Sequence, residues 1–209
     1  MRILFQGDSI TDVGSSANIA DKMGYGYPLL VKAEMGFEYP GKYEFFNRGI
    51  GGNRIVDIYA RMKRDILNLK PDVMSILVGV NDAWHEVIES EQNGVDSEKF
   101  YKIYSMLIEE IKSSLPDTKI IMFGPYVLKG TNTEDKWDYF ATEVPKRAEM
   151  AKRVAEEHGI MYIPLQEKFD EALKIAPSEY WCVDGVHPTA YGHELIKREW
   201  IKAFKNLIN

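Results

Sequence analysis

The sequence is poor in cysteine and in long apolar runs. Its single cysteine, Cys182, excludes a disulfide within the chain, and such sparse use of cysteine is typical of a reducing compartment. No apolar run approaches the roughly 20 residues that a membrane-spanning helix needs. At the N-terminus only three apolar residues separate Arg2 from Gln6, too few for a signal peptide. We therefore expect a cytoplasmic protein that does not bind membranes.

Clusters of positive charge are missing as well. The chain has 26 Lys and Arg against 32 Asp and Glu, a net charge of −6. An acidic chain without a basic run is a poor candidate for binding nucleic acid or an anionic membrane. Repeats, low-complexity stretches and linkers are also missing. We therefore expect one domain over residues 1–209, a length at which about 70% of the unfolded chain's surface becomes buried.

What the sequence does contain is an alternation of apolar runs with amphipathic stretches. Segment 72–79 is almost continuously apolar, as in a parallel strand that is buried on both faces. Between 54 and 70, apolar residues recur at three- and four-residue steps, which predicts a helix that Pro71 ends. The patterns predict strands at 2–6, 43–49, 72–79, 119–124 and 160–165. They predict helices at 25–37, 54–70, 97–115, 139–158 and 189–207, with Ser97 as an N-cap.

Strands that alternate with helices at this spacing predict an α/β fold, with a parallel sheet covered by helices on both faces. In such sheets the chemistry lies at the carboxyl ends of the strands. Three polar segments lie at predicted strand ends, namely GDSIT, NRGIGGN and GVNDAW. A fourth, VDGVHP, precedes the last predicted helix.

The first three of these segments carry groups that acyl transfer uses. Ser9 offers a hydroxyl, and Asn81 offers a side-chain amide. Gly51 and Gly52 allow a backbone N–H to approach a ligand closely. Each segment alone is equally typical of an ordinary turn, with Asp8 or Ser9 capping a helix. Their joint occurrence at one predicted edge favours a catalytic site.

The fourth segment places Asp184 three residues before His187, with Gly185 between them to permit a tight bend. A histidine that acts as a base needs a partner that fixes its tautomer. A carboxylate three residues away on one turn can supply that partner. Pro188 then stands where the last helix can begin.

In this order, the four segments resemble those of the SGNH-hydrolase superfamily, also called GDSL-type esterases. The resemblance spans residues 7 to 188, nearly the whole chain. It implies a flavodoxin-like three-layer α/β/α sandwich with a central, mainly parallel sheet of five strands. It also implies Ser9 as the nucleophile and Asp184 and His187 as the rest of a catalytic triad. The oxyanion hole would be formed by the N–H groups of Ser9 and Gly52 and by the amide of Asn81.

The four segments are most similar to those of bacterial carbohydrate acetylesterases of this superfamily, which include intracellular acetylxylan esterases. The resemblance implies a small-molecule or oligosaccharide ester as substrate. The loops expected at 11–26 and 85–97 present no broad apolar wall, which argues for a short acyl group on a polar alcohol. We therefore expect a serine esterase that removes acetyl groups from carbohydrates through an acyl-enzyme intermediate.

Two alternatives stay open. Relatives in this superfamily include thioesterases and lysophospholipases, which would act on a different acyl substrate. The same α/β/α frame also serves non-catalytic, flavodoxin-like binding domains. Against a phosphate-binding loop, Asp8 and Asp12 flank the first turn, and two carboxylates would repel a phosphate.

Aromatic residues near the four segments are candidate substrate contacts. Trp84, Tyr126 and Trp181 could form a stacking wall for a sugar, and core packing is an equal alternative for each. His85 is expected in an exposed loop. Cys182 is expected as a small buried residue and not as a nucleophile.

No residues show the spacing of zinc ligands, so the sequence predicts no metal site and no cofactor. The resemblance also implies assembly into a homo-oligomer, because relatives of this kind often assemble. The long segment 11–26 is the candidate interface.

Overall fold

The computed structural model describes residues 1–15, 22–87 and 92–208. Within these residues, five strands form one sheet in the order β2-β1-β3-β4-β5, and every pairing is parallel. This is the doubly wound order of flavodoxin-like folds, so the α/β class and the parallel five-stranded sheet are confirmed. The strands are β1 (Arg2–Gly7), β2 (Glu44–Gly49), β3 (Val73–Leu77), β4 (Lys119–Phe123) and β5 (Met161–Ile163).

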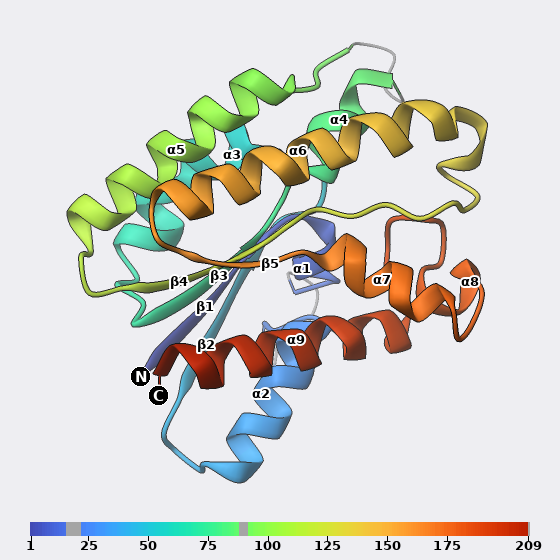
Figure 1. The fold of residues 1–209 in the computed structure, drawn as a ribbon. Coiled ribbons are helices and arrows are strands. Elements are labelled where there is room, and N and C mark those ends of the chain that lie inside the picture. Colours follow the sequence, from blue (N-terminus) through green and yellow to red (C-terminus); the bar gives the residue numbers. More distant parts are fainter. Residues whose placement is uncertain (16–21, 88–91, 209) are drawn as a thin grey trace.

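Helices cover both faces of this sheet (Figure 1). On one side lie α3, α5 and α6, and on the other lie α2, α7 and α9. The α-helices are α1 (Ser9–Asp12), α2 (Tyr27–Glu38), α3 (Ile55–Met62), α4 (Val80–Val87), α5 (Ser97–Ser114), α6 (Trp137–Glu157), α7 (Leu165–Leu173), α8 (Ser178–Trp181) and α9 (Ala190–Ile208). Two short turns complete them, the π-helical η1 (Lys63–Leu67) and the 3₁₀-helical η2 (Glu134–Lys136).

The alternation of side chains along β1 divides the core into two layers. Ile3 and Phe5 pack with α2 and α9, whereas Leu4 packs with α3 and α5 on the opposite face. All three side chains are fully buried. A strand that is buried on both faces must be apolar at successive positions, which is why this segment reads as a continuous apolar run.

Most predicted elements are present near their expected positions, and three details differ. The helix predicted at 54–70 is α3 followed by the π-helical turn η1. The N-cap of α5 is Asp96 and not Ser97, because the Asp96 carboxylate accepts a hydrogen bond from the Lys99 N–H at 2.9 Å. Three helices were not expected, α4, α7 and α8, whereas α1 is the helix capped by Asp8 that was the alternative for GDSIT.

The topology fixes where polar groups can gather. From β1 the chain first adds β2 on one side and then returns to add β3 on the other side of β1. In such folds ligands usually bind in the crevice outside the carboxyl ends of the two strands where this change of side occurs, here β1 and β3. The segments after β1, β2 and β3 all lie at this edge. In the described part of the chain, no helix is both long enough and apolar enough to cross a membrane.

Candidate active site

Ser9 lies where β1 ends and α1 begins. Asp8 is the N-cap of α1, and its Oδ1 accepts a hydrogen bond from the Ile10 N–H at 3.0 Å. A Cβ at Gly7 would lie only 2.4 Å from Thr11 Oγ1 and 2.5 Å from the Leu77 carbonyl oxygen. Only glycine therefore fits the tight turn that presents Ser9 at the sheet edge.

Three side chains that the sequence singled out form a continuous chain of hydrogen bonds. Ser9 Oγ lies 2.9 Å from His187 Nε2, although 178 residues separate them in sequence. On the other side of the ring, His187 Nδ1 lies 2.7 Å from Asp184 Oδ2. This is the geometry in which a histidine can take a proton from a hydroxyl while a carboxylate orients its ring.

The charges of Asp184 and His187 are set by their mutual contact. Burial opposes ionisation of Asp184. Hydrogen bonds from the His187 ring and from the backbone N–H groups of His187 and Val186 outweigh it, and hold its pKa well below the ordinary range. The hydrogen bond to Asp184 in turn raises the pKa of His187 above 6.5, against an opposing effect of burial. An ionised Asp184 thus stabilises a protonated His187.

The residues predicted to bind an oxyanion come from the next two strand ends. Gly52 adopts φ +77°, a left-handed conformation that favours glycine. The neighbouring Gly51 N–H donates to Asp12 Oδ2 at 3.2 Å, which ties this turn to α1. Asn81, in the first turn of α4, donates from Nδ2 to the Asn53 carbonyl at 3.1 Å. The turns after β1, β2 and β3 are thereby linked to one another.

Two carboxyl groups are buried beneath these turns. Asp8 is 1% exposed, and its Oδ2 has no hydrogen-bond partner among the residues that the structure describes. Burial raises its pKa to about 7, against the opposing effects of the Ile10 N–H and His187. Burial likewise raises the pKa of Asp82 to about 7, although its carboxylate accepts the Ile55 N–H. Both carboxyls can therefore carry a proton near neutral pH.

Two predictions about single residues are wrong. Tyr126 cannot contact a substrate, because it is fully buried, stacks on Phe169 and donates its hydroxyl to the Val186 carbonyl. His85 does not lie in an exposed loop. It is partly buried on α4, and a methyl group at Gly52 would lie 4.0 Å from its Nε2.

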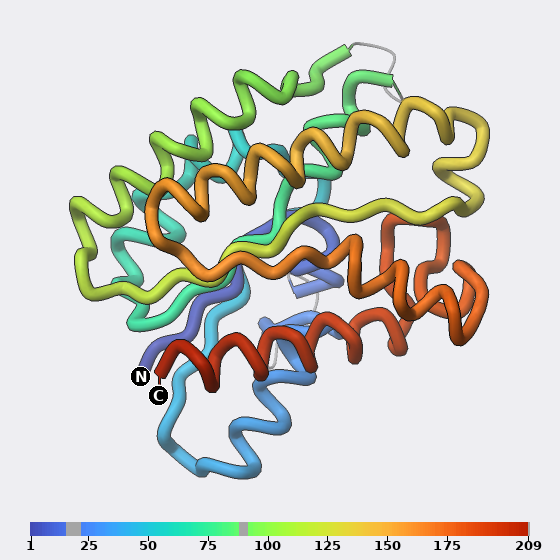
Figure 2. The backbone as a smooth tube through the Cα atoms, viewed as in Figure 1, coloured from blue at the N-terminus to red at the C-terminus, as the bar shows by residue number. Residues whose placement is uncertain are grey.

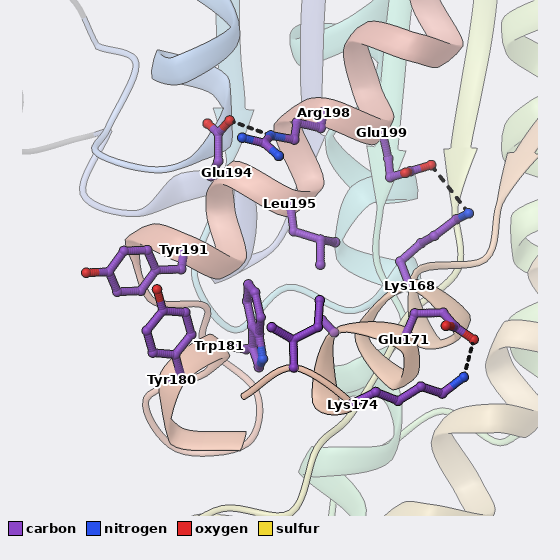
Figure 3. A pocket seen from close by; sticks show the side chains of 12 residues that line it. Lys168, Glu171, Lys174, Tyr180, Trp181, Tyr191, Glu194, Leu195, Arg198 and Glu199 are labelled. Carbon is purple, nitrogen blue, oxygen red and sulfur yellow. Dashed lines mark hydrogen bonds and ion pairs between the residues drawn. The ribbon is translucent and has the colours of Figure 1, made fainter. Parts of the chain in front are cut away.

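The other two aromatic candidates lie in different surroundings. Trp84 is half-buried on α4 with its ring 5.3 Å from that of Phe140, and its contact with a substrate stays a prediction. Trp181 lines a pocket of about 650 Å³ between α7, α8 and α9 (Figure 3). Of the described residues that line this pocket, none belongs to the predicted triad or oxyanion hole. Trp181 therefore faces a cavity away from Ser9.

Cys182 is buried as expected, and burial raises the pKa of its thiol to about 12. A thiol in this state is a poor nucleophile. The centres of the two loops expected to shape the substrate pocket, 16–21 and 88–91, lie outside the described residues. The predicted interface at 11–26 is therefore described only in part.

One polar residue at the site was missed. Asn132, in the segment between β4 and α6, donates from Nδ2 to Asp184 Oδ2 at 2.8 Å. Asn132 follows the strand predicted at 119–124, and this position is the feature that could have marked it as a site residue. An asparagine close to glycine and threonine is also typical of an ordinary turn, so the sequence alone did not distinguish it.

Comparison with known proteins identifies the class. An acetylxylan esterase of Geobacillus stearothermophilus is 28% identical over 208 residues, which cover 96% of this chain and 92% of the relative. The crystal structure of Axe2, an acetylxylan esterase from the same organism, matches with a TM-score of 0.84 at 28% identity, over 97% of this chain and 93% of the other. A GDSL-like lipase from Parabacteroides merdae matches with a TM-score of 0.87 at 35% identity, over 97% and 94% of the two chains. The protein is a carboxylic ester hydrolase and not a non-catalytic binding domain.

The family follows from a match that covers most of the chain. Residues 5–195 match the GDSL-like lipase/acylhydrolase family. The chain belongs to this family.

Proposed function

We propose that this enzyme removes acetyl groups from carbohydrate hydroxyls through a Ser9-His187-Asp184 triad. One observation carries the proposal: Ser9 Oγ, His187 and Asp184 are joined by hydrogen bonds of 2.9 and 2.7 Å at the carboxyl edge of the sheet. Catalytic mutants of the related acetylxylan esterase replace a serine, an aspartate and a histidine by alanine. In that protein the aspartate stands three positions before the histidine, as Asp184 does before His187.

In the first half of the reaction, Ser9 Oγ attacks the ester carbonyl carbon while His187 Nε2 takes the hydroxyl proton. The tetrahedral intermediate then collapses, and the bond to the leaving alcohol breaks. The alcohol oxygen takes the proton back from His187. This leaves the acetyl group on Ser9 and a neutral imidazole.

In the second half, water attacks the acetyl carbonyl and gives its proton to His187 Nε2. Collapse of this intermediate breaks the bond to Ser9 Oγ, which takes the proton from His187. Acetic acid is released and loses its remaining proton to water as acetate. In both halves, the N–H groups of Ser9 and Gly52 and the Asn81 amide stabilise the negative oxygen. Support for Gly52 comes from its conformation and from its N–H, which has no acceptor within the described residues.

Support for a carbohydrate ester comes from the relatives. Structures related to this chain include an acetyl-xylooligosaccharide esterase at 27% identity. A short acyl group also agrees with the sequence of the loops near Ser9, which lack the broad apolar wall that a long acyl chain would need.

Hydrolysis of p-nitrophenyl acetate tests the chemistry. We expect turnover that a serine-directed organophosphonate abolishes, with the label on Ser9 by peptide mass spectrometry. Ser9→Ala and His187→Ala should each lower kcat by about 10⁴-fold or more. Ser9→Ala enzyme that kept most of its activity would contradict the assignment.

Acyl-chain length tests the substrate class. We expect activity to fall steeply from acetyl to octanoyl esters of p-nitrophenol. Mass spectrometry should show that acetylated xylo-oligosaccharides lose about 42 Da for each acetyl group that is replaced by hydrogen. A preference for octanoyl esters would instead indicate a thioesterase or lysophospholipase type of acyl hydrolase.

A further inference from the structure

The segment from Leu128 to Thr133, here called the 128–133 segment, runs against the loop that carries Asp184 and His187. In Figure 2 it is the yellow-green stretch that passes beside the red-orange loop. Two backbone hydrogen bonds join them: the Leu128 N–H donates to the Gly185 carbonyl at 2.8 Å, and the Asn132 N–H donates to the Asp184 carbonyl at 3.1 Å. The position of the carboxylate thus depends on a segment more than 50 residues away in sequence.

The fit between these two stretches is tight. A Cβ at Gly130 would lie 2.4 Å from both the Asp184 carbonyl carbon and the Gly185 nitrogen. The fully buried Thr133 closes the segment on itself, since its hydroxyl donates to the Leu128 carbonyl at 2.7 Å and accepts the Gly130 N–H at 2.9 Å. The backbone of Asn132 is therefore held in one place relative to Asp184.

The Asp184 carboxylate accepts hydrogen bonds at both oxygens. Its Oδ1 accepts the N–H groups of Val186 and His187 at 3.0 and 2.8 Å, which come from its own turn. Its Oδ2 faces His187 Nδ1 at 2.7 Å and also accepts from Asn132 Nδ2 at 2.8 Å. Within the described residues, Asn132 gives this carboxylate its one donor from outside residues 184–187.

We propose that Asn132 is a positioning residue for catalysis, which fixes the rotation of the Asp184 carboxylate so that Oδ2 points at His187. Asn132 acts through Asp184 and touches no reacting atom. This role rests on the proposed function, because it needs Asp184 and His187 to act as acid and base partners. Two hydrogen bonds, one from its backbone and one from its side chain, set the distance between Asn132 and Asp184.

The rotation of the Asp184 carboxylate also affects the pKa of His187. The hydrogen bond between Asp184 Oδ2 and His187 Nδ1 is what raises this pKa. Without the Asn132 donor, Oδ2 can turn away from His187, so the pKa of His187 falls. A side chain that only held the loop together would leave this pKa unchanged.

Asn132→Leu tests the proposal, because leucine has nearly the same shape and no donor. We expect kcat for p-nitrophenyl acetate to fall by about 10-fold, with KM changed by less than about twofold. The acidic limb of the kcat/KM profile should move down by about 0.3–1 pH unit. Asn132→Gln, which keeps the amide, should recover more of the activity than Asn132→Leu.

The neighbouring Thr131→Ala is the matched control, since Thr131 is exposed and lies in the same turn. It should leave both kcat and the pH profile unchanged. If Asn132→Leu lowered the melting temperature but left kcat and the acidic limb unchanged, the positioning role would be wrong and the residue merely structural. A separate measurement tests the proposed function itself: if the Ser9→Ala enzyme remains active, the proposed function is wrong, whatever Asn132 does.

Discussion

At the scale of single residues, His187 is controlled by the carboxylate beside it. Asp184 Oδ2 lies 2.7 Å from His187 Nδ1 and is its largest electrostatic influence. The two side chains differ in exposure, because 46% of the His187 side chain is accessible against 14% for Asp184. The histidine can therefore reach a substrate, while the carboxylate stays partly shielded from water.

The pH profile reports this contact. His187, the proposed base, must be neutral to take the Ser9 proton, and its pKa is raised above 6.5. We expect the acidic limb of kcat/KM to have its midpoint above pH 6.5. Asp184→Asn should move this midpoint down and lower kcat by about 10⁴-fold, because the raised pKa and the ring tautomer both depend on the carboxylate. An unchanged midpoint in Asp184→Asn would contradict the pairing.

Substitution of Asn81 tests its proposed role in the oxyanion hole. Asn81→Ala should lower kcat by about 10²–10³-fold, because one donor to the developing negative charge is lost. Asn81→Asp keeps the shape but removes the donor, and should be as inactive. Steady-state kinetics on p-nitrophenyl acetate measures both. Activity within threefold of the unmodified enzyme would exclude Asn81 from the oxyanion hole.

At the scale of elements, long periodic stretches were predictable and short ones were not. The 18 residues of α5 carry a clear apolar stripe, which a sequence pattern reveals directly. The four residues of α1 and of α8 are too short to show a period. Helix α4 begins with Val80 and continues through Asn81 and Asp82, which are residue types that usually indicate a turn. Its first turn instead packs into the core beside β3, and tertiary contacts decide its conformation.

The loop that carries Asp184 and His187 depends on one glycine. Gly185 has φ +99°, and a Cβ there would lie 2.5 Å from both the Leu128 carbonyl oxygen and Thr133 Oγ1. Gly185→Ala should lower the free energy of unfolding by about 2–4 kcal/mol, since it adds backbone strain to a clash. Chemical denaturation measures this change.

Gly36→Ala is the matched control for that substitution. Gly36 lies within α2, and a Cβ there would meet no atom within 4 Å. Alanine should stabilise the protein here by about 0.5–1 kcal/mol, because it loses less conformational freedom than glycine. Equal effects at the two positions would contradict the tight fit around Gly185.

At the scale of the whole molecule, stability depends on a carboxyl that burial keeps from ionising. Asp8 is 1% exposed, and burial raises its pKa from 3.8 to about 7. The folded protein therefore binds this proton more tightly than the unfolded chain. Between about pH 4 and pH 7, Asp8 makes folding progressively less favourable as pH rises, and the loss is complete above pH 7.

Asp8→Asn removes that dependence while keeping an oxygen to accept the Ile10 N–H. The free energy of unfolding of this variant should exceed that of the unmodified protein only slightly at pH 4, and by about 2–4 kcal/mol at pH 8. Urea unfolding at the two pH values measures it, and Asp135→Asn, at an exposed position, is the control. An advantage that did not grow with pH would show that Asp8 ionises freely in the folded protein.

The sequence by itself determined the order of strands and helices and the types of residue at the strand ends. Those features are local, because periodicity and turn chemistry depend on neighbouring residues. The tertiary structure decided which of these residues meet. Ser9 and His187 lie 178 positions apart, and Asn132 and Asp184 lie 52 apart. Tyr126 and Asn132 follow the same strand, yet one is fully buried and the other contacts the Asp184 carboxylate. Such contacts arise from the packing of distant segments against one another, and no pattern within a single segment encodes them.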